Sequence, residues 1–400
     1  EQWTTRLQNW DRSTDGHMIG NSIGLAKQVM TKMTQLAVQA GTIMDRVNRD
    51  VIFRNYATGR TVSETASAAT TTIEVPTVAG FTHQLNAITG ALDPVSANNT
   101  KRVSINGTLA AEVLIAATPT DANLPYGPGT LTFAGNVAVA ANDPIRAEEA
   151  PAIIYTGGGA SVDAIVSSEV LALEDVQTAS AVLQDTGVPK HPDGYYHCHL
   201  TSSMSASFTR QFTDKGLLDG RGPDAWSAYT VGVLADVRFM RNSEVPRQGN
   251  VGTLVAGRPT AASSARTSVE VGIEMINAGG VPLIYTVVTG GNAVVERQRN
   301  LFYDLTGETG MGSLGYNGAV GSFRPQPGDN GVVANVSGIK FLIGKPSGKK
   351  GDTFPMTWQM MTSFGVPSDV RAGHYGSRLK RCVVIVSADN SFSGVSVFQE

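Results

Sequence analysis

The feature that most restricts the fold of this chain is a long helical pattern near its N-terminus. Within residues 17–56, apolar side chains recur at steps of three and four residues, which places them on one face of an α-helix. They are Ile23, Ala26, Met30, Met33, Ala37, Ala40, Met44, Val47 and Val51. A helix of about 35 residues would extend about 50 Å, longer than most helices in a compact domain. The pattern predicts one helix that crosses a domain; the alternative is two helices broken near Gly41, because an interior glycine costs about 1 kcal/mol.

The texture of the sequence changes abruptly after Gly59. Short runs rich in Val, Thr and Ile, such as TTTIEVP, KRVSING and GTLTFAGNVAV, alternate with Gly, Pro, Asn and Asp. This is the pattern of a small antiparallel β domain, and its bounds are about 57 and 152. Because helical segments precede and follow it, we expect it to be an insertion. The Ala/Thr-rich run 65–72 within it is predicted to be a mobile loop.

The middle of the chain predicts an α/β lobe. A second helix is expected within residues 167–187, with Ser167 or Ser168 as its N-cap and Gly187 as its end. Its apolar face would hold Val170, Leu173, Val176, Ala179 and Leu183. The stretch GYYHCHLT predicts a strand, SSMSASFTRQFTDKGLL a helix, and VGVLADVRFMRNSEVP one further strand. Near the end of the chain, GIKFLIGKPSG, TFPMTWQMMTSFGVPSD and LKRCVVIVSADN predict three strands, so the fold class is α+β.

Composition limits the class of protein. A chain of 400 residues is long enough for two or three lobes with large cores. Charged residues make up only 16% and the net charge is −3, which argues against a disordered or DNA-coating protein. No stretch of eighteen apolar residues predicts a membrane span, and the N-terminus lacks the features of a signal peptide. The two cysteines, Cys198 and Cys382, lie far apart and predict no disulfide framework, which fits a reducing cytosol.

The densest chemistry lies in HPDGYYHCHLT, residues 191–201, which holds His191, His197 and His199 together with Cys198. On a strand, His197 and His199 point to one face and Cys198 to the other, so the thiol and the imidazoles cannot converge on one metal. A zinc site on His197 and His199 would need further ligands, such as His17, His83 or His374, at no known spacing. We therefore expect a strand that presents two histidines to solvent or to a neighbouring subunit.

Two glycine-rich stretches and two basic runs invite a phosphate-binding interpretation. Gly344-Lys345 lacks the spacing, the Ser/Thr and the helix of a Walker loop, and GGGAS at 157–161 lacks a dinucleotide fingerprint, so we interpret it as a hinge between lobes. The basic residues lack interleaved aromatics, so solvated loops or ion pairs between subunits are the default interpretation. They are Lys345, Lys349, Lys350, Arg371, Arg378, Lys380 and Arg381.

The order of the expected elements is more specific than any single motif. A long helix, an inserted β domain, an α/β lobe and return strands follow one another. Several strings accompany that order: HMIGNSIGLAKQVMTKMTQLAVQAGTIMDRVNRDVIFRNYATGRT; VAGFT and GTLTFAG with DPIRAEEAP; VPKHPDGYYHCHLTSSMSASF; DVRFMRNSEVP; and MTWQMMTSFGVPSD with LKRCVVIVSA. In this order the chain resembles the major capsid (coat) proteins of tailed bacteriophages, which have the Hong Kong 97-type fold. The resemblance covers most of the chain from about residue 17.

The resemblance implies a division of the chain. Residues 1–56 would form a P-domain segment with the spine helix, 57–152 the inserted β domain, 153–300 the A-domain, and 301–400 return strands of the A- and P-domains. In the family an N-terminal arm and an extended loop precede the spine helix, where this chain has about 16 residues.

The implied function is self-assembly into an icosahedral shell that encloses a double-stranded DNA genome, with no catalysis. The partners would be copies of the chain, as hexamers and pentamers, together with scaffolding, portal and decoration proteins and non-specific contacts with packaged DNA. No membrane is involved. The protein would be assembled in the bacterial host cytoplasm and located in the virion. No catalytic, cofactor-binding or metal residue and no cofactor is implied.

Two other functions stay open at this point. The first is a two-lobed hydrolase that uses His197, His199 and Asp193, which requires a deep pocket where these side chains converge. The second is another β-rich virion protein, such as a decoration or fibre protein, which the β-rich insertion favours. Such proteins are usually trimers without a long helix.

Overall fold

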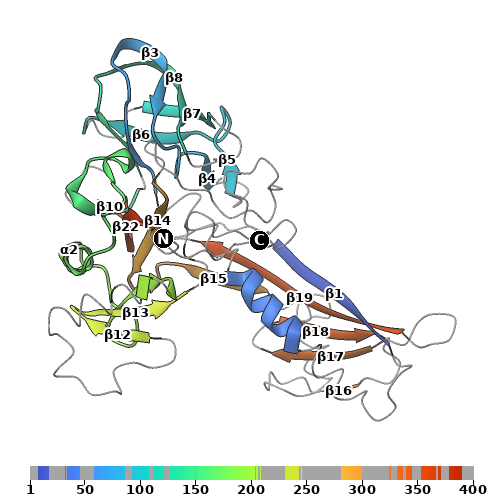
Figure 1. Cartoon of the computed structure of the whole chain (residues 1–400). Coiled ribbons are helices and arrows are strands. Elements are labelled where there is room, and N and C mark those ends of the chain that lie inside the picture. Colours follow the sequence, from blue (N-terminus) through green and yellow to red (C-terminus); the bar gives the residue numbers. More distant parts are fainter. Residues whose placement is uncertain are drawn as a thin grey trace, which may run out of the picture. The chain divides into compact units, whose positions relative to one another are not determined.

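The chain folds into two compact units and passes back and forth between them. The computed structural model describes residues 8–17, 32, 34–45, 58–85, 92–107, 112–120, 127–148, 150–202, 204–205, 208, 230–242, 245, 281–299, 324–325, 331–336, 339–344, 353–365, 368–370 and 378–389. The first unit comprises Glu1–Asn48 and Val295–Gly365, and the second comprises Arg49–Val294 and Val366–Glu400. The described part is mostly β-strand with few helices (Figure 1).

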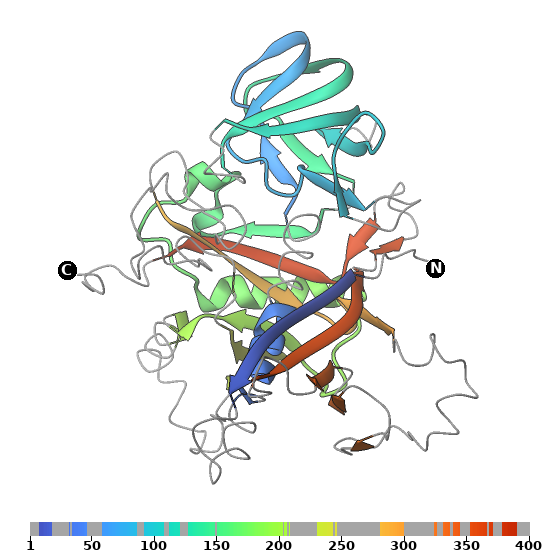
Figure 2. The same cartoon turned by 90° about the vertical axis from the view of Figure 1, so that its right-hand side faces the viewer.

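The first unit is built on one long strand, β19 (Thr353–Gly365). β1 (Gln8–His17) runs antiparallel to it from Gln8 opposite Thr362 to His17 opposite Thr353. β15 (Val295–Arg299) and β18 (Ile339–Gly344) also pair with β19, and β17 (Gly331–Val336) and β16 (Arg324–Pro325) extend the sheet beyond β18. Figures 1 and 2 show β1, in blue, running along β19. The sheet therefore pairs a strand near the start of the chain with strands more than 270 residues later in sequence. The sequence did not predict β1.

The predicted N-terminal helix is present in its described part, residues 34–45. It continues through Gly41, so the alternative of a break at this residue is wrong. Leu36 and Ala40 form its buried face, whereas Ala37, which the sequence placed on that face, is exposed. His17 belongs to β1, and most of the predicted helix 17–56 lies outside the described residues.

The second unit begins with a six-stranded antiparallel sheet, which we call the insert sheet. Its order is β2-β9-β6-β7-β8-β3. The strands are β2 (Arg60–Val62), β3 (Ser67–Val75), β6 (Lys101–Ile105), β7 (Glu112–Pro119), β8 (Gly129–Val139) and β9 (Pro144–Ala147). Alternate residues such as Ile73, Leu114 and Phe133 fill one core, and a small hairpin of β4 (His83–Leu85) and β5 (Leu92–Pro94) accompanies the sheet.

The prediction of a mobile loop at 65–72 is wrong. Residues from Ser67 onward form β3 and pair with β8, with Thr72 opposite Thr132 and Ile73 opposite Leu131. Threonine is β-branched and suits a pleated, half-buried strand, and Ile73 and Val75 anchor this one in the core.

The rest of the second unit is a mixed six-stranded sheet, which we call the lobe sheet, in the order β10-β22-β14-β11-β13-β12. β10–β22 and β11–β13 are parallel pairs and the other pairs are antiparallel. The strands are β10 (Ala152–Tyr155), β11 (Tyr196–Leu200), β12 (Thr230–Leu234), β13 (Val237–Arg241), β14 (Leu283–Thr289) and β22 (Cys382–Ala388). Every residue of β14 and β22 is buried, because apolar clusters cover both faces.

One face of the lobe sheet is covered by α2 (Leu173–Asp185), whose Val176, Ala179 and Leu183 are buried. The predicted caps Ser167 and Ser168 precede it by several residues. The start is set instead by the Asp175 carboxylate, which accepts a 2.9 Å hydrogen bond from the Ala172 N–H. The predicted end is confirmed, since Gly187 has a φ of +73°.

One other sequence prediction fails because contacts made far along the chain decide the local conformation. The single strand predicted at 231–246 is a hairpin, β12–β13, with Ala235 and Asp236 both at positive φ. The Ala235 carbonyl accepts a hydrogen bond from Ser180 on α2. The stretch GGGAS starts in a 3-10 turn within the second unit, where Gly157 packs against the Glu169 side chain, and its role as a hinge stays a prediction.

The predicted domain bounds can be placed beside these elements, although the division itself stays a prediction. The insert sheet lies within 57–152. Of the return strands, β16–β19 belong to the sheet of the first unit and β22 to the lobe sheet. β15, which the predicted A-domain contained, pairs with β19. β20 (Ser368–Val370) and β21 (Arg378–Lys380) pair with each other.

Two glycines near the insert sheet, Gly80 and Gly107, differ in how closely other backbone atoms approach them. Both have positive φ, but a Cβ on Gly80 would lie 2.3 Å from the Gly59 backbone nitrogen, whereas a Cβ on Gly107 meets nothing within 4 Å. We expect Gly107→Ala to cost about 1 kcal/mol of unfolding free energy and Gly80→Ala more than about 3 kcal/mol. Urea denaturation of both variants measures the difference, and equal costs would contradict this packing.

Candidate functional site

The turn and strand at residues 191–200 gather the chain's densest chemistry, as the sequence indicated. The predicted strand is confirmed as β11. Gly194, at a φ of +85°, allows the tight turn before it, and its N–H donates to the His191 carbonyl at 2.8 Å. Along β11, Tyr196, Cys198 and Leu200 are buried in the core with α2, and His197 and His199 alternate with them. The prediction that Cys198 points away from His197 and His199 is confirmed.

Three chain segments meet in what we call the histidine cluster: His191, Asp193, His197 and Arg238. The rings of His191 and His197 stack with centroids 3.8 Å apart and an interplanar angle of 6°. The Asp193 carboxylate accepts from His197 Nε2 at 2.8 Å and from Arg238 Nη1 at 2.6 Å. Asp193 therefore ties the turn before β11 to both β11 and β13.

A fourth segment joins the cluster through Thr289 at the end of β14. Its Oγ1 donates to the His197 carbonyl at 3.3 Å. The same oxygen lies 3.2 Å from His191 Nε2, and since its hydrogen is already committed, His191 Nε2–H must be the donor of that contact. The stacked histidines thus act as cross-links between the turn, β11 and β14.

The charges in the cluster are set by burial and by Asp193. Burial raises the pKa of the Asp193 carboxyl, but hydrogen bonds from His197 and the Tyr195 N–H, with the charge of Arg238, outweigh it and hold the pKa below its usual value. Burial, then the neighbouring His197, lowers the pKa of His191. Burial, followed by His197 and His191, lowers the pKa of His199 to about 4. His191 and His199 are therefore neutral at pH 7.

The stacked rings of His191 and His197 do not suit a shared metal ion. Zinc bonds in the plane of an imidazole at about 2.0–2.1 Å, and two parallel stacked rings cannot both direct a lone pair at one ion. Among the described residues no group of three His, Cys, Asp or Glu side chains is placed to hold a metal. Of the other candidates, His83 bonds Thr82 in the β4 hairpin, His17 lies in β1 of the first unit, and His374 lies outside the described residues.

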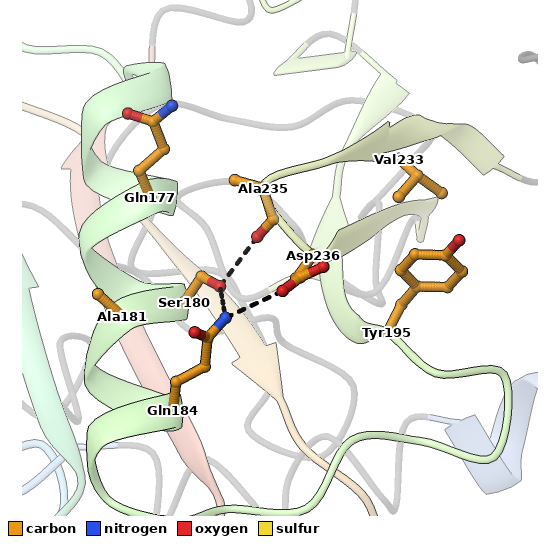
Figure 3. A pocket seen from close by; sticks show the side chains of 8 residues that line it. All are labelled: Gln177, Ser180, Ala181, Gln184, Tyr195, Val233, Ala235 and Asp236. Carbon is orange, nitrogen blue, oxygen red and sulfur yellow. Dashed lines mark hydrogen bonds between the residues drawn. The ribbon is translucent and has the colours of Figure 1, made fainter.

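A polar groove of about 630 Å³ lies close to the cluster, between α2 and the β12–β13 hairpin (Figure 3). Gln184 Nε2 lies 3.2 Å from both the Ser180 hydroxyl and the Asp236 carboxylate, and Ser180 in turn donates to the Ala235 carbonyl at 2.9 Å. The polar groups drawn in Figure 3 thus largely bond one another rather than a common point. The sequence did not reveal this groove, because it predicted one strand where the hairpin forms.

Of the basic residues that the sequence singled out, Arg381 makes a contact that stabilises a turn. Arg381 Nη1 donates to the Gly291 carbonyl at 3.3 Å and so fixes the turn after β14. Lys345, Lys349, Lys350 and Arg371 lie outside the described residues, and Arg378 and Lys380 lie in β21. In the described part of the chain no helix is long and apolar enough to cross a membrane.

Comparison with solved structures finds similarity to bacteriophage head and capsid structures. No protein-family model and no curated protein matches it. The capsid of Ralstonia phage GP4 is similar, with a TM-score of 0.31 at 10% identity over 59% of this chain and 52% of that one. The head structure of Helicobacter pylori bacteriophage KHP40 is similar with a TM-score of 0.36 at 8% identity, over 96% and 75%. The capsid structure of cyanophage P-SCSP1u has a TM-score of 0.29 at 10% identity, over 60% and 54%.

All of these are bacteriophage head or capsid structures. This chain covers about half, 52%, of the GP4 chain that it matches. TM-scores this low do not establish a common fold and place no residue of this chain in a known site.

Acid is expected to destabilise the second unit through His199 and His191. Their folded-state pKa values lie below that of an unfolded histidine, so between about pH 6.5 and 4 the unfolded chain binds protons that the folded chain excludes. The unfolding free energy should therefore fall as the pH drops through this window, by at most about 3 kcal/mol from His199.

Thermal unfolding between pH 7.5 and 4.5 checks this expectation. His199→Gln should flatten the decline, whereas the control His83→Gln, in the β4 hairpin, should leave it unchanged. A full decline in His199→Gln would contradict the assignment.

Neither thiol is expected to act as a nucleophile. Cys198 and Cys382 are both buried, and burial raises the pKa of the Cys198 thiol. A disulfide reagent such as DTNB should label both cysteines at least ~100-fold more slowly in the native protein than in guanidinium. Rapid labelling of one equivalent in the native state would reveal a reactive cysteine and reopen the enzyme interpretation.

Proposed function

We propose that this chain is the major capsid protein of a tailed bacteriophage, with the Hong Kong 97-type fold, and that it assembles into an icosahedral shell around double-stranded DNA. The observation that carries the proposal is the path of the chain. β1 and β15–β19 join into one sheet. The insert sheet and five of the six strands of the lobe sheet lie between β1 and β15 in sequence, and the sixth, β22, follows β19. A helical segment, an inserted β sheet, an α/β lobe and return strands follow one another in the order that the resemblance to phage coat proteins implies.

The polar chemistry of the described residues supports a structural role. In the histidine cluster, Asp193 is engaged by His197 and Arg238, and in the groove Gln184 is engaged by Ser180 and Asp236. Catalysis needs groups held ready for a substrate, and these groups hold the protein's own turns and strands together. The alternative hydrolase built on His197, His199 and Asp193 gains no support from this arrangement.

The composition of the chain also suits repeated contacts between copies. A shell protein buries loops and strand edges against identical neighbours, and interfaces of that kind are depleted in charged residues. This chain has only 16% charged residues and a net charge of −3. Several weak contacts per subunit then act together and hold a closed shell.

The finer parts of the proposal follow from the resemblance. Residues 34–45 would belong to the spine helix of a P-domain, residues 57–152 to an inserted domain, and residues 153–300 to an A-domain at the capsomer axes. Pentamers and hexamers of the chain would form the shell, with scaffolding, portal and decoration proteins as further partners and with non-specific contacts to packaged DNA. The protein would be located in the virion after assembly in the host cytoplasm.

Assembly is the property that tests this proposal. The purified chain should form pentamers, hexamers or megadalton shells that are visible by negative-stain electron microscopy and by light scattering. A decoration or fibre protein would instead give trimers, and a hydrolase would give monomers or small oligomers. A chain that is folded by circular dichroism and remains monomeric at high concentration, with and without a crowding agent, would contradict the proposal.

A further inference from the structure

Two arginines face each other across neighbouring strands of the insert sheet. Arg60 on β2 and Arg146 on β9 are directly opposite in the antiparallel register. Side chains at such positions lie on one face with their Cβ atoms about 4.5–5.5 Å apart, and like charges placed there repel. Both arginines are partly exposed. The pair therefore concentrates two positive charges at one place on an acidic chain.

No carboxylate among the described residues forms an ion pair with either guanidinium. Arg60 Nη1 donates to the Ile153 carbonyl at 3.3 Å, and Arg146 Nη2 donates to the Ala150 carbonyl at 2.9 Å. The Arg60 guanidinium also lies over the ring of Tyr155, 5.7 Å from its centroid. Burial raises the pKa of Tyr155 to about 12, so its hydroxyl stays neutral and supplies no counter-charge.

The electrostatic effect of this arrangement is visible at Arg146. Burial lowers the pKa of its guanidinium, and the neighbouring charge of Arg60 lowers it further. An arginine remains protonated at pH 7 in any case, so the repulsion between the two cations persists until an anion relieves it.

Hydrogen bonds to backbone carbonyls hold the two guanidinium groups in place, and each group keeps further N–H donors for a ligand. Each guanidinium carries five N–H donors in a planar fork, and within the described residues one donor of each is bonded to a carbonyl. One carbonyl belongs to Ala150, in the link between β9 and β10, and the other to Ile153, in β10. Ser104 on β6 is opposite Arg146 on the other side of β9 and adds a hydroxyl to the same face.

We propose that Arg60 and Arg146 form a binding site for a phosphate group. Arginine forks match the spacing of phosphate oxygens and bind them through paired, charge-assisted hydrogen bonds. A phosphate dianion would neutralise both cations and a phosphodiester one of them, and the Ser104 hydroxyl would donate to a further oxygen. The phosphate is supplied either by free inorganic phosphate or by a phosphodiester of nucleic acid. The site does not depend on the capsid proposal.

The test is the phosphate-dependent shift in the melting temperature of the full chain, measured against sodium chloride at equal ionic strength. Phosphate also stabilises proteins non-specifically, so the comparison between variants decides the outcome. Arg146→Gln should weaken phosphate binding about tenfold and lose most of the specific shift, and Arg146→Lys should keep part of it. The matched control is Arg241→Gln, an exposed arginine at the end of β13 in the lobe sheet, which should behave as the wild type.

The outcomes are distinguishable from a loss of folding, because the readout is the difference between phosphate and chloride within each variant. A short DNA duplex that competes with phosphate would identify the phosphodiester as the source, and phosphate binding without competition would identify the free ion. Equal phosphate shifts in the wild type and Arg146→Gln, with no duplex binding by either, would overturn the site. Shell assembly enters none of these measurements.

Discussion

The second unit depends on one strand contributed by the end of the chain. β22 lies between β10 and β14 and is parallel to the first and antiparallel to the second. Val383 and Ile385 enter the apolar cluster that contains α2, and Cys382, Val384 and Val386 enter the cluster on the opposite face. Each face of the lobe sheet therefore loses part of its core if this strand is missing. Pairing Ala152 with Val383 closes a very long loop, and contacts of this kind form slowly.

The histidine cluster also joins distant segments of the second unit, on the side of β14 where β11 pairs with it. Asp193, His197 and Arg238 join the turn before β11 to β13, and the Gly291 N–H donates to the Pro189 carbonyl at 2.7 Å. Gly291 lies only a few residues before Val295, where the chain passes from the second unit to the first. Asp193 and His197 resembled a reaction centre in the sequence. In the structure they stabilise the turn before β11, which in turn contacts the turn after β14 where the chain leaves the second unit.

The sequence predicted those parts of the fold that local chemistry decides. Alternation along β11, the buried run of β22 and the end of α2 at Gly187 all follow from side-chain periodicity and glycine conformation. It failed where distant contacts decide. Ala235 and Asp236 adopt positive φ because α2 and Lys190 bind them, and β1 becomes a strand because β19 offers its edge. The candidate site showed the same limit, since alternation separated Cys198 from the histidines but could not predict the stacking of His191 on His197.

The ends of the insert sheet lie next to each other. The Ala147 N–H donates to the Gly59 carbonyl at 2.8 Å, and a Cβ added to Gly59 would lie 3.2 Å from the Ala147 Cβ. A unit whose entry and exit are joined in this way imposes almost no spacing on the rest of the chain. It can be exchanged for a sheet of another size, or carry a foreign peptide at its exposed turn Asn106-Gly107, while the lobe keeps its register. A change of length within the insert sheet would therefore leave the spacing between Gly59 and Ala147, where the chain enters and leaves it, unchanged.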